Sequence, residues 1–270
     1  MVVQHNLSAM NTNRQLGTVT SSLSKSTEKL SSGYKINRAA DDAAGLSISE
    51  KMRSQIRGLN QASTNAQAGI SLIQVAEGAL NETHSILQRM NELATQAAND
   101  TNTSIDRTAI SAEMNQLTSE INRIQSTTQF NTMNLLDGTF TSKNLQVGAM
   151  SGQTIVISVT KMSASNIGVS GLSVSSNTNA GKAMSKIQLA IQSVSAQRSK
   201  LGAIQNRLEH TINNLEATSE NTSSAESRIR DTDMASEMVE YSKNNILQQA
   251  GQSMLAQANQ QTQGVVSLLQ

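Results

Sequence analysis

Apolar residues recur every seven positions between residues 43 and 98. A line of small and aliphatic residues carries the repeat, and a second line lies three positions further along. The first line is Leu59, Ala66, Ile73, Leu80, Leu87 and Ala94, and the second is Ala62, Ala76, Met90 and Ala97. This is the spacing of the a and d positions in packed helices. It predicts one helix of roughly 80 Å that lies along partner helices for most of its length.

The same periodicity predicts three further helices. Residues 1–32 carry an apolar stripe that shifts register once, and 104–128 and 181–218 carry two more. The stripe of the first helix is Leu7, Met10, Leu16, Leu23 and Leu30, and that of the last is Ile187, Val194, Leu201, Leu208 and Leu215. The turn expected at 99–103 is short, so the helix after it is expected to fold back antiparallel.

Between residues 130 and 179 the pattern changes to alternation among Gly, Ser, Thr and Asn. Leu145 and Val147 form one alternating pair, and Ile155, Ile157 and Val159 form another run, which predicts two short strands. Residues 224–233 are charged and small, and we interpret them as a connection. The expected fold class is mainly α, a long antiparallel helical bundle or coiled-coil hairpins with a small central β-hairpin region.

The last 27 residues, 244–270, contain no Asp, Glu, Lys, Arg or His. Gln and Asn interrupt the segment too often for it to cross a bilayer. Its apolar residues follow a helical rhythm at Leu247, Met254, Ala258, Val265, Leu268 and Leu269. A helix with one apolar stripe and a neutral polar back is expected to be surrounded by other protein.

Composition limits the possible functions. Aromatic residues are 1% of the chain, and Pro, Trp and Cys are absent, which favours long helices with thin seams and excludes disulfides and thiolate metal sites. The net charge of +1 implies no general attraction to nucleic acid or membrane. The first residues lack the basic region and apolar run of a secretory signal, so the protein is expected to stay in the cytoplasm or to leave by a route without a cleaved signal.

No constellation of residues supports catalysis. His5, His84 and His210 are isolated from one another, and no motif for zinc, phosphate or a nucleophilic serine is present. Asp41 and Asp42 precede a predicted helix, where acidic residues complement the helix N-terminus. We expect no enzyme activity, no cofactor and no metal site.

Three blocks of sequence resemble bacterial flagellins. Residues 36–49, which include Asn37, Arg38, Asp41, Asp42 and Gly45, resemble the amino-terminal signature of that family. Residues 128–131 with 135–138 resemble its junction between helix and β region, and residues 256–269 resemble its carboxy terminus. Together the blocks cover almost the whole chain in the family's order.

The resemblance implies a subunit that polymerises into the flagellar filament for swimming motility. It implies an inner-tube helix with its connecting spoke at 1–42, a long helical hairpin of the core domain at 43–130 and a small β-hairpin region at 131–180. A return helix follows at 181–223, and a spoke and carboxy-terminal inner-tube helix at 224–270. Only about 50 residues lie where many members carry large outer domains, so those domains are expected to be absent.

The resemblance also implies partners. Members of the family are exported through the flagellar export apparatus, escorted by a chaperone on the carboxy-terminal helix, and meet junction and cap proteins at the filament ends. Residues 87–96 resemble the stretch bound by the vertebrate Toll-like receptor for flagellin, with Arg89, Leu93 and Glu113 as contacts. The alternative is that Arg89 is a solvated charge and that Leu93 packs against the next subunit.

Two other functions remain open on the sequence. A hook–filament junction protein shares terminal helices with flagellins, but its central part is usually larger. A non-flagellar coiled-coil adaptor would carry charged positions flanking its seams over long runs, whereas the ends of this chain are nearly neutral.

Overall fold

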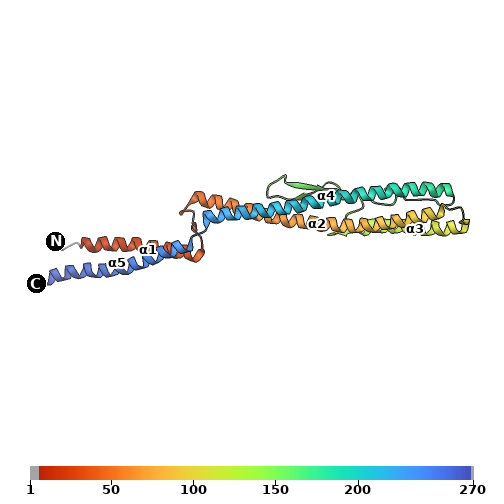
Figure 1. Ribbon diagram of the computed structural model, residues 1–270. Coiled ribbons are helices and arrows are strands. Elements are labelled where there is room, and N and C mark those ends of the chain that lie inside the picture. Colours follow the sequence, from red (N-terminus) through yellow and green to blue (C-terminus); the bar gives the residue numbers. More distant parts are fainter. Residues whose placement is uncertain (1–5, 269–270) are drawn as a thin grey trace. The chain divides into compact units, whose positions relative to one another are not determined.

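The computed structural model describes residues 6–268, with side chains up to residue 261. Within that range the helices are α1 (Leu7–Ser32), α2 (Ala43–Ala97), α3 (Ser104–Thr127), α4 (Asn177–Arg230) and α5 (Met234–Leu268) (Figure 1). The strands are β1 (Gln129–Phe130), β2 (Met133–Asn134), β3 (Lys143–Gln146) and β4 (Thr154–Ile157). Long helices with two small two-stranded sheets confirm the predicted fold class.

The chain divides into two compact units. The terminal unit combines the first part of the chain, up to residue 54, with the last part, from residue 221. The central unit comprises residues 55–220. Each has its own packing.

In the terminal unit, α1 and α5 lie side by side and run antiparallel (Figure 1). Near one end of the pair, the Asn6 amide donates to the Ala258 carbonyl at 2.9 Å. Near the other end, Lys29 Nζ lies 3.4 Å from Glu237 Oε2. These two contacts, far apart along both helices, fix the register of the pair.

The ends of α1 and the connection that follows it are held by hydrogen bonds. Asn6 caps the N-terminus, and Gly33 ends the helix at φ +76°, in the left-handed region that glycine adopts without strain. The Lys35 N–H then donates to the Arg230 carbonyl at 2.7 Å, and the Thr232 N–H donates to the Gly33 carbonyl at 3.0 Å. The connection after α1 therefore pairs with the connection after α4.

The core of the central unit follows the predicted heptads. All ten a and d residues predicted for α2 are buried, with exposed fractions of at most 6%. The other helices contribute Ile110, Met114 and Ile121 from α3, and Ile187, Val194, Leu201, Leu208 and Leu215 from α4. The predicted return of α3 alongside α2 is confirmed, because residues of both helices belong to one buried cluster.

Side chains from two other elements close the C-terminus of α2. Arg107 Nε donates to the Ala97 carbonyl at 3.1 Å, and Arg107 Nη2 donates to the Asn99 carbonyl at 3.2 Å. The Asn177 amide, at the start of α4, donates to the Ala98 carbonyl. The last carbonyls of a helix have no partner within the helix, so these donors stabilise the turn that sends α3 back along α2.

The small β region differs in part from the prediction. β3 and β4 pair antiparallel, with Leu145 opposite Ile155, close to the predicted strands. β1 and β2 were not predicted, because two residues each are too few to show alternation. The turn between them holds Asn131 and Thr132 at φ +46° and +63°, as in a tight two-residue hairpin.

The connection predicted at 224–233 is wrong over most of its length. α4 continues to Arg230 and α5 already begins at Met234, so the return helix does not end at residue 223. The stretch contains neither Gly nor Pro, so nothing in it breaks a helix. Glu226 also accepts a 2.7 Å hydrogen bond from the buried Ser49 hydroxyl. The real break is short and ends at Asp233, whose carboxylate accepts from the first N–H groups of α5.

Candidate assembly surface

The face of α5 that packs on α1 is mostly polar. Its seam residues are spaced three and four apart and are Glu237, Tyr241, Asn244, Gln248, Gly251, Leu255 and Ala258. Asn244 is only 5% exposed, and its Nδ2 has no hydrogen-bond partner within the described residues. A buried amide without a partner costs free energy. This seam therefore uses little of the apolar surface that α5 carries.

The opposing face of α1 is more apolar. Its seam residues are Ala9, Thr12, Leu16, Val19, Leu23, Ser26 and Leu30. The predicted stripe residues Leu16, Leu23 and Leu30 therefore lie in the contact with α5. Gly251 allows the helices to approach closely, since a Cβ there would lie 3.3 Å from Leu16 Cδ1.

Other members of the predicted stripe face away from this seam. Leu7 and Met10 are 66% and 62% exposed, because the shift in register before Leu16 turns them to the opposite side of α1. In α5, Ala258 lies in the seam, whereas Leu247 and Met254 do not. Val265 and Leu268 lie in the helical backbone of α5, beyond the described side chains, and Leu269 lies outside the described residues.

Five apolar residues of α5 share one exposed face, which we call the outer α5 face, whereas the exposed Met234 and Met238 lie outside it. It comprises Val239, Ile246, Leu247, Ala250 and Met254, and the four large side chains are at least 46% exposed. At 3.6 residues per turn these positions share one side of the helix, away from the seam. Val239 and Ile246 were missed from the sequence, although their spacing of seven was visible. A contiguous exposed apolar face of this kind marks an interaction surface.

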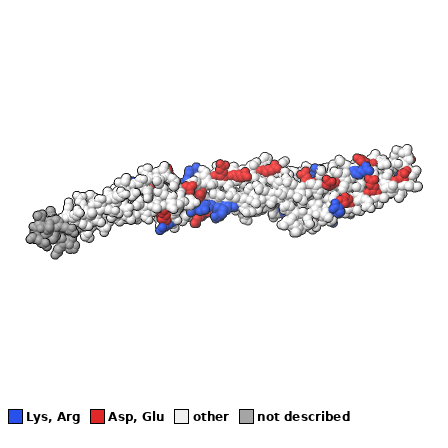
Figure 2. Space-filling model, turned by 90° about the horizontal axis from the view of Figure 1, so that it is seen from below, with Lys and Arg blue, Asp and Glu red and all other residues white. Residues whose placement is uncertain are grey.

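Charge is sparse in the part of the α1–α5 pair that contains the start of α1 and the later turns of α5. Residues 6–24 carry Arg14 alone, and residues 244–261 carry no charge. In Figure 2 the surface next to the grey terminal residues is accordingly white. The ion pairs of these helices, Lys29–Glu237 and Lys243–Glu240, lie toward the other end of the pair.

The two carboxylates of the signature around residue 40 accept backbone hydrogen bonds just before and at the start of α2. The Asp41 carboxylate accepts from the N–H groups of Asn37 and Arg38, at 3.2 and 3.0 Å. The bond from the Arg38 N–H is the main reason why the pKa of Asp41 lies below its ordinary value. Asp42 accepts from the Gly45 N–H at 2.9 Å at the start of α2. Asp42 thus acts at the start of α2, as the helix-terminus interpretation predicted, whereas Asp41 holds the turn before it.

Gly45 is required by close packing. A Cβ at this position would collide with the Asp42 carboxylate and would lie 2.8 Å from Ile36 Cδ1. Arg38, another signature residue, ties this segment to α1, because its guanidinium donates to both oxygens of Glu28, at 2.9 and 3.1 Å. The signature therefore fixes how α1 connects to α2.

The residues matched to receptor recognition are not equally accessible. Arg89 donates to Glu113 on α3 at 3.0 and 3.1 Å and to Glu92 at 3.1 Å, and these bonds raise its pKa. The side chains of Arg89 and Glu113 are about half exposed, at 51% and 46%. Leu93 is 2% exposed and belongs to the core, because α2 packs on α3 as well as α4 and buries more than its heptad line. The side chain of Leu93 is thus buried within its own subunit.

None of the helices within the described residues combines the length and apolar character needed to span a bilayer. Among the same residues, no three His, Asp or Glu side chains come together as ligands for a metal ion.

Comparison with known proteins gives a consistent result. Residues 3–141 match the bacterial flagellin N-terminal helical region, and residues 184–269 match the bacterial flagellin C-terminal helical region. The chain is 57% identical to a flagellin of Halalkalibacterium halodurans and 50% identical to a flagellin of Bacillus subtilis, each over the full length of both proteins. Among solved structures, the flagellin of Bacillus cereus matches 56% of this chain and 88% of its own, with 32% identity and a TM-score of 0.52.

Proposed function

The chain belongs to the bacterial flagellins, and from that premise we propose that the outer α5 face is a contact between copies of it. The protein is a structural subunit that polymerises into the bacterial flagellar filament, and nothing favours a hook–filament junction protein or a coiled-coil adaptor. A filament of identical subunits requires head-to-tail contacts that do not close on themselves. Each copy must therefore carry a surface that its own fold leaves uncovered.

The outer α5 face is the observation that supports this proposal. Its large side chains are exposed, while the seam toward α1 is mostly polar and holds an unpaired amide. Each Leu-sized side chain that becomes buried contributes roughly 1.5–3 kcal/mol. Four such residues, each already partly covered, still supply several kcal/mol toward the cost of ordering and joining the subunits. Leu7 and Met10, on the far side of α1, add a second uncovered apolar surface.

Seeded polymerisation of the purified chain tests the outer α5 face. Ile246→Asn and Leu247→Asn are expected to raise the critical concentration for growth at least tenfold each, because each removes about 1.4 kcal/mol or more from the contact. Gln249→Asn is the matched control, since it places the same residue on the same helix away from this face. Circular dichroism of the monomers checks that helix content is unchanged. Assembly of both variants at the wild-type critical concentration would refute the proposal.

We also propose that the neutral polar face of α5 lines the export channel of the filament. Asn245, Gln249 and Gln252 share this face, and no charge lies beside them between residues 244 and 261. A charge here would recur in every copy along the wall and would hold passing, unfolded subunits of opposite charge. Gln249→Lys and Gln252→Lys are therefore expected to give shorter filaments in cells, with Gln249→Asn unaffected. Normal filament length in the lysine variants would contradict this role.

We propose that a chaperone assists export of the chain and that export does not use a cleaved signal. The support is the exposed outer α5 face, a surface that needs cover before assembly, and the family's export route through the flagellar apparatus. Leu247→Asn is expected to weaken binding to the cognate export chaperone. The intact mass of filament protein is expected to match the full 28.8 kDa chain. Loss of an amino-terminal segment would contradict signal-independent export.

We propose that the vertebrate Toll-like receptor for flagellin recognises this chain through Arg89 and Glu113. Both are about half exposed on adjacent helices. Leu93 would act by packing that holds this turn of α2 in place, since its own side chain is buried. Arg89→Ala is expected to lower affinity for the receptor ectodomain. Arg123→Ala, which removes another exposed arginine paired with a carboxylate, serves as the control. Unchanged affinity of Arg89→Ala would reject the assignment.

A further inference from the structure

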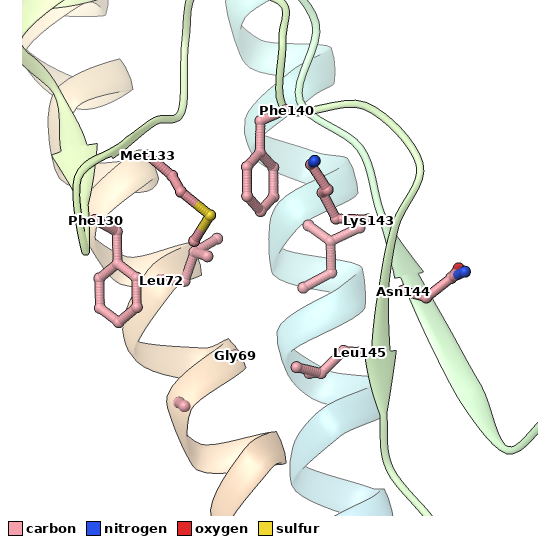
Figure 3. A pocket seen from close by; sticks show the side chains of 10 residues that line it. Gly69, Leu72, Phe130, Met133, Phe140, Lys143, Asn144 and Leu145 are labelled. Carbon is pink, nitrogen blue, oxygen red and sulfur yellow. The ribbon is translucent and has the colours of Figure 1, made fainter. Parts of the chain in front are cut away.

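Both phenylalanines of the chain line one apolar cavity in the central unit (Figure 3). The cavity has a volume of about 300 Å³ and lies between α2 and the β region. Phe130, Met133 and Phe140 line it together with Leu72 of α2. Phe140 is only 4% exposed and forms the base of the site, whereas Met133 is 42% exposed.

The charge around the cavity is positive. Lys143 is the one charged residue among those that line it. Residues 130–179 as a whole carry Lys143 and Lys161 against a single acidic residue, Asp137. The site therefore suits an apolar side chain that carries acidic neighbours.

The same unit presents such a side chain elsewhere. Ile105, in the first turn of α3, is 79% exposed, the largest exposure of any large apolar residue described. The side chain of Asp100 is 81% exposed although it pairs with Arg107 at 3.2 Å, and Asp106, also exposed, follows Ile105 directly. The capping box of Thr103 and Asp106 fixes the start of α3, so Ile105 is held on a rigid turn.

Ile105 cannot reach the cavity of its own subunit. Leu72 and the end of α2 at Ala97 are 25 residues apart, which corresponds to about 38 Å along the helix. If Ile105 of one copy enters the cavity of the next, the two copies are shifted along the helix direction. Such head-to-tail contacts do not close into a ring and build open polymers. The separation therefore favours a second copy of the chain as the occupant of the cavity.

We propose that Ile105 of one subunit inserts into the cavity between Phe130, Met133 and Phe140 of a neighbouring subunit. This contact rests on the proposed function, since it exists only in the filament. Asp100 and Asp106 then face Lys143, which orients the two subunits. The contact lies in the central unit and is independent of the outer α5 face.

Engineered cysteines test the contact directly, because the chain contains no cysteine of its own. The double variant Ile105→Cys, Met133→Cys is polymerised and then oxidised. A ladder of disulfide-linked dimers, trimers and longer chains is expected on a non-reducing gel from filaments, and monomer only from unpolymerised protein. Each single variant is expected to give no ladder, because Ile105 of one copy meets Met133, and not Ile105, of the next. Ile105→Cys, Leu189→Cys is the control, since Leu189 is 62% exposed but does not line the cavity.

The outcomes separate this contact from the proposed function. Normal filaments in which the 105–133 pair links no faster than the 105–189 pair would overturn the contact and leave filament formation standing. Failure of the unmodified chain to form filaments under seeding would overturn both. A ladder from the 105–133 pair alone supports the contact.

Charge reversal provides a second test that depends on different side chains. Lys143→Glu is expected to raise the critical concentration several-fold at low salt, and adding Asp100→Lys is expected to restore it. The Asp100→Lys single variant is expected to be impaired in the same direction. Lack of any recovery in the double variant would count against the orientation proposed here. Equal effects at high and low salt would do so as well, because exposed charges are screened by salt.

Discussion

Two helical glycines of α2 make opposite predictions for the same substitution. Gly58 lies against the turn between β3 and β4, where an added Cβ would be 2.9 Å from Ala149 Cβ and 3.3 Å from Ala149 Cα. Gly78 lies further along the same helix, and a Cβ added there would meet nothing within 4 Å. Alanine cannot rotate away, so at Gly58 the turn itself has to move.

Two contributions set the expected change in the free energy of unfolding, helix propensity and packing. Replacing an interior helical glycine by alanine gains about 1 kcal/mol of helix propensity at either position. Overpacking at Gly58 costs roughly 1–3 kcal/mol because backbone has to shift. We therefore expect Gly78→Ala to raise the free energy of unfolding by about 1 kcal/mol, and Gly58→Ala to leave it unchanged or lower it by up to about 2 kcal/mol. The propensity term cancels in the difference between the two variants, which isolates the packing of the β region on α2.

Urea denaturation of the full-length monomer, followed by circular dichroism, measures both variants. For a unit of this size, 1 kcal/mol corresponds to roughly 2–4 °C in the midpoint of thermal unfolding, which gives a second measurement. Equal stabilisation by Gly58→Ala and Gly78→Ala would refute the reasoning, because it would mean that the β3–β4 turn does not rest on α2 as closely as the structure places it.

Three further substitutions test the caps. Arg107→Ala should lower the free energy of unfolding by about 1–2 kcal/mol, because it leaves α2 carbonyls without donors, whereas the exposed Arg123→Ala should change it by less than about 0.5 kcal/mol; equal effects in urea denaturation would argue against the cap. The hydroxyl and N–H of Thr103 lower the pKa of Asp106, so this carboxylate stabilises the fold above its ordinary pKa and the gain is lost as pH falls through the lowered value. Asp106→Asn should therefore flatten the loss of stability below about pH 4, and an unchanged acid titration would contradict this assignment. Gly45→Ala should lower the melting temperature by pushing the Asp42 cap off α2, and a rise would show that the cap tolerates a methyl group.

Much of the central unit could be predicted from periodicity. The heptads of α2 and α4 identify buried residues because a helix repeats its faces every 3.6 residues, whatever it packs against. The helix limits of α2 and α3 agree with the prediction to within a residue, because Asp42 and Thr103 cap their starts through local hydrogen bonds. Local interactions of this kind are present in the sequence itself.

The errors have a common cause. The stretch at 224–233 was interpreted from composition as a connection, yet the contact between Ser49 and Glu226 comes from residues far apart in sequence. Leu93 lies outside the narrow heptad line and is buried because a third helix covers it. Both outcomes depend on neighbours that no local pattern specifies.

The terminal helices show what the sequence alone determined and what only the tertiary structure determined. The sequence alone established that residues 244–270 lack charge, that they carry an apolar stripe and that such a stripe requires a partner. Only the tertiary structure decided that α1 is not the partner of Leu247 and Met254, because the register set by Asn6 with Ala258 and by Lys29 with Glu237 turns the polar seam of α5 inward. Periodicity defines the faces of a helix, but the antiparallel register with a neighbour selects which face is covered. The face left over, from Val239 to Met254, is the one through which we propose that the subunit meets its copies.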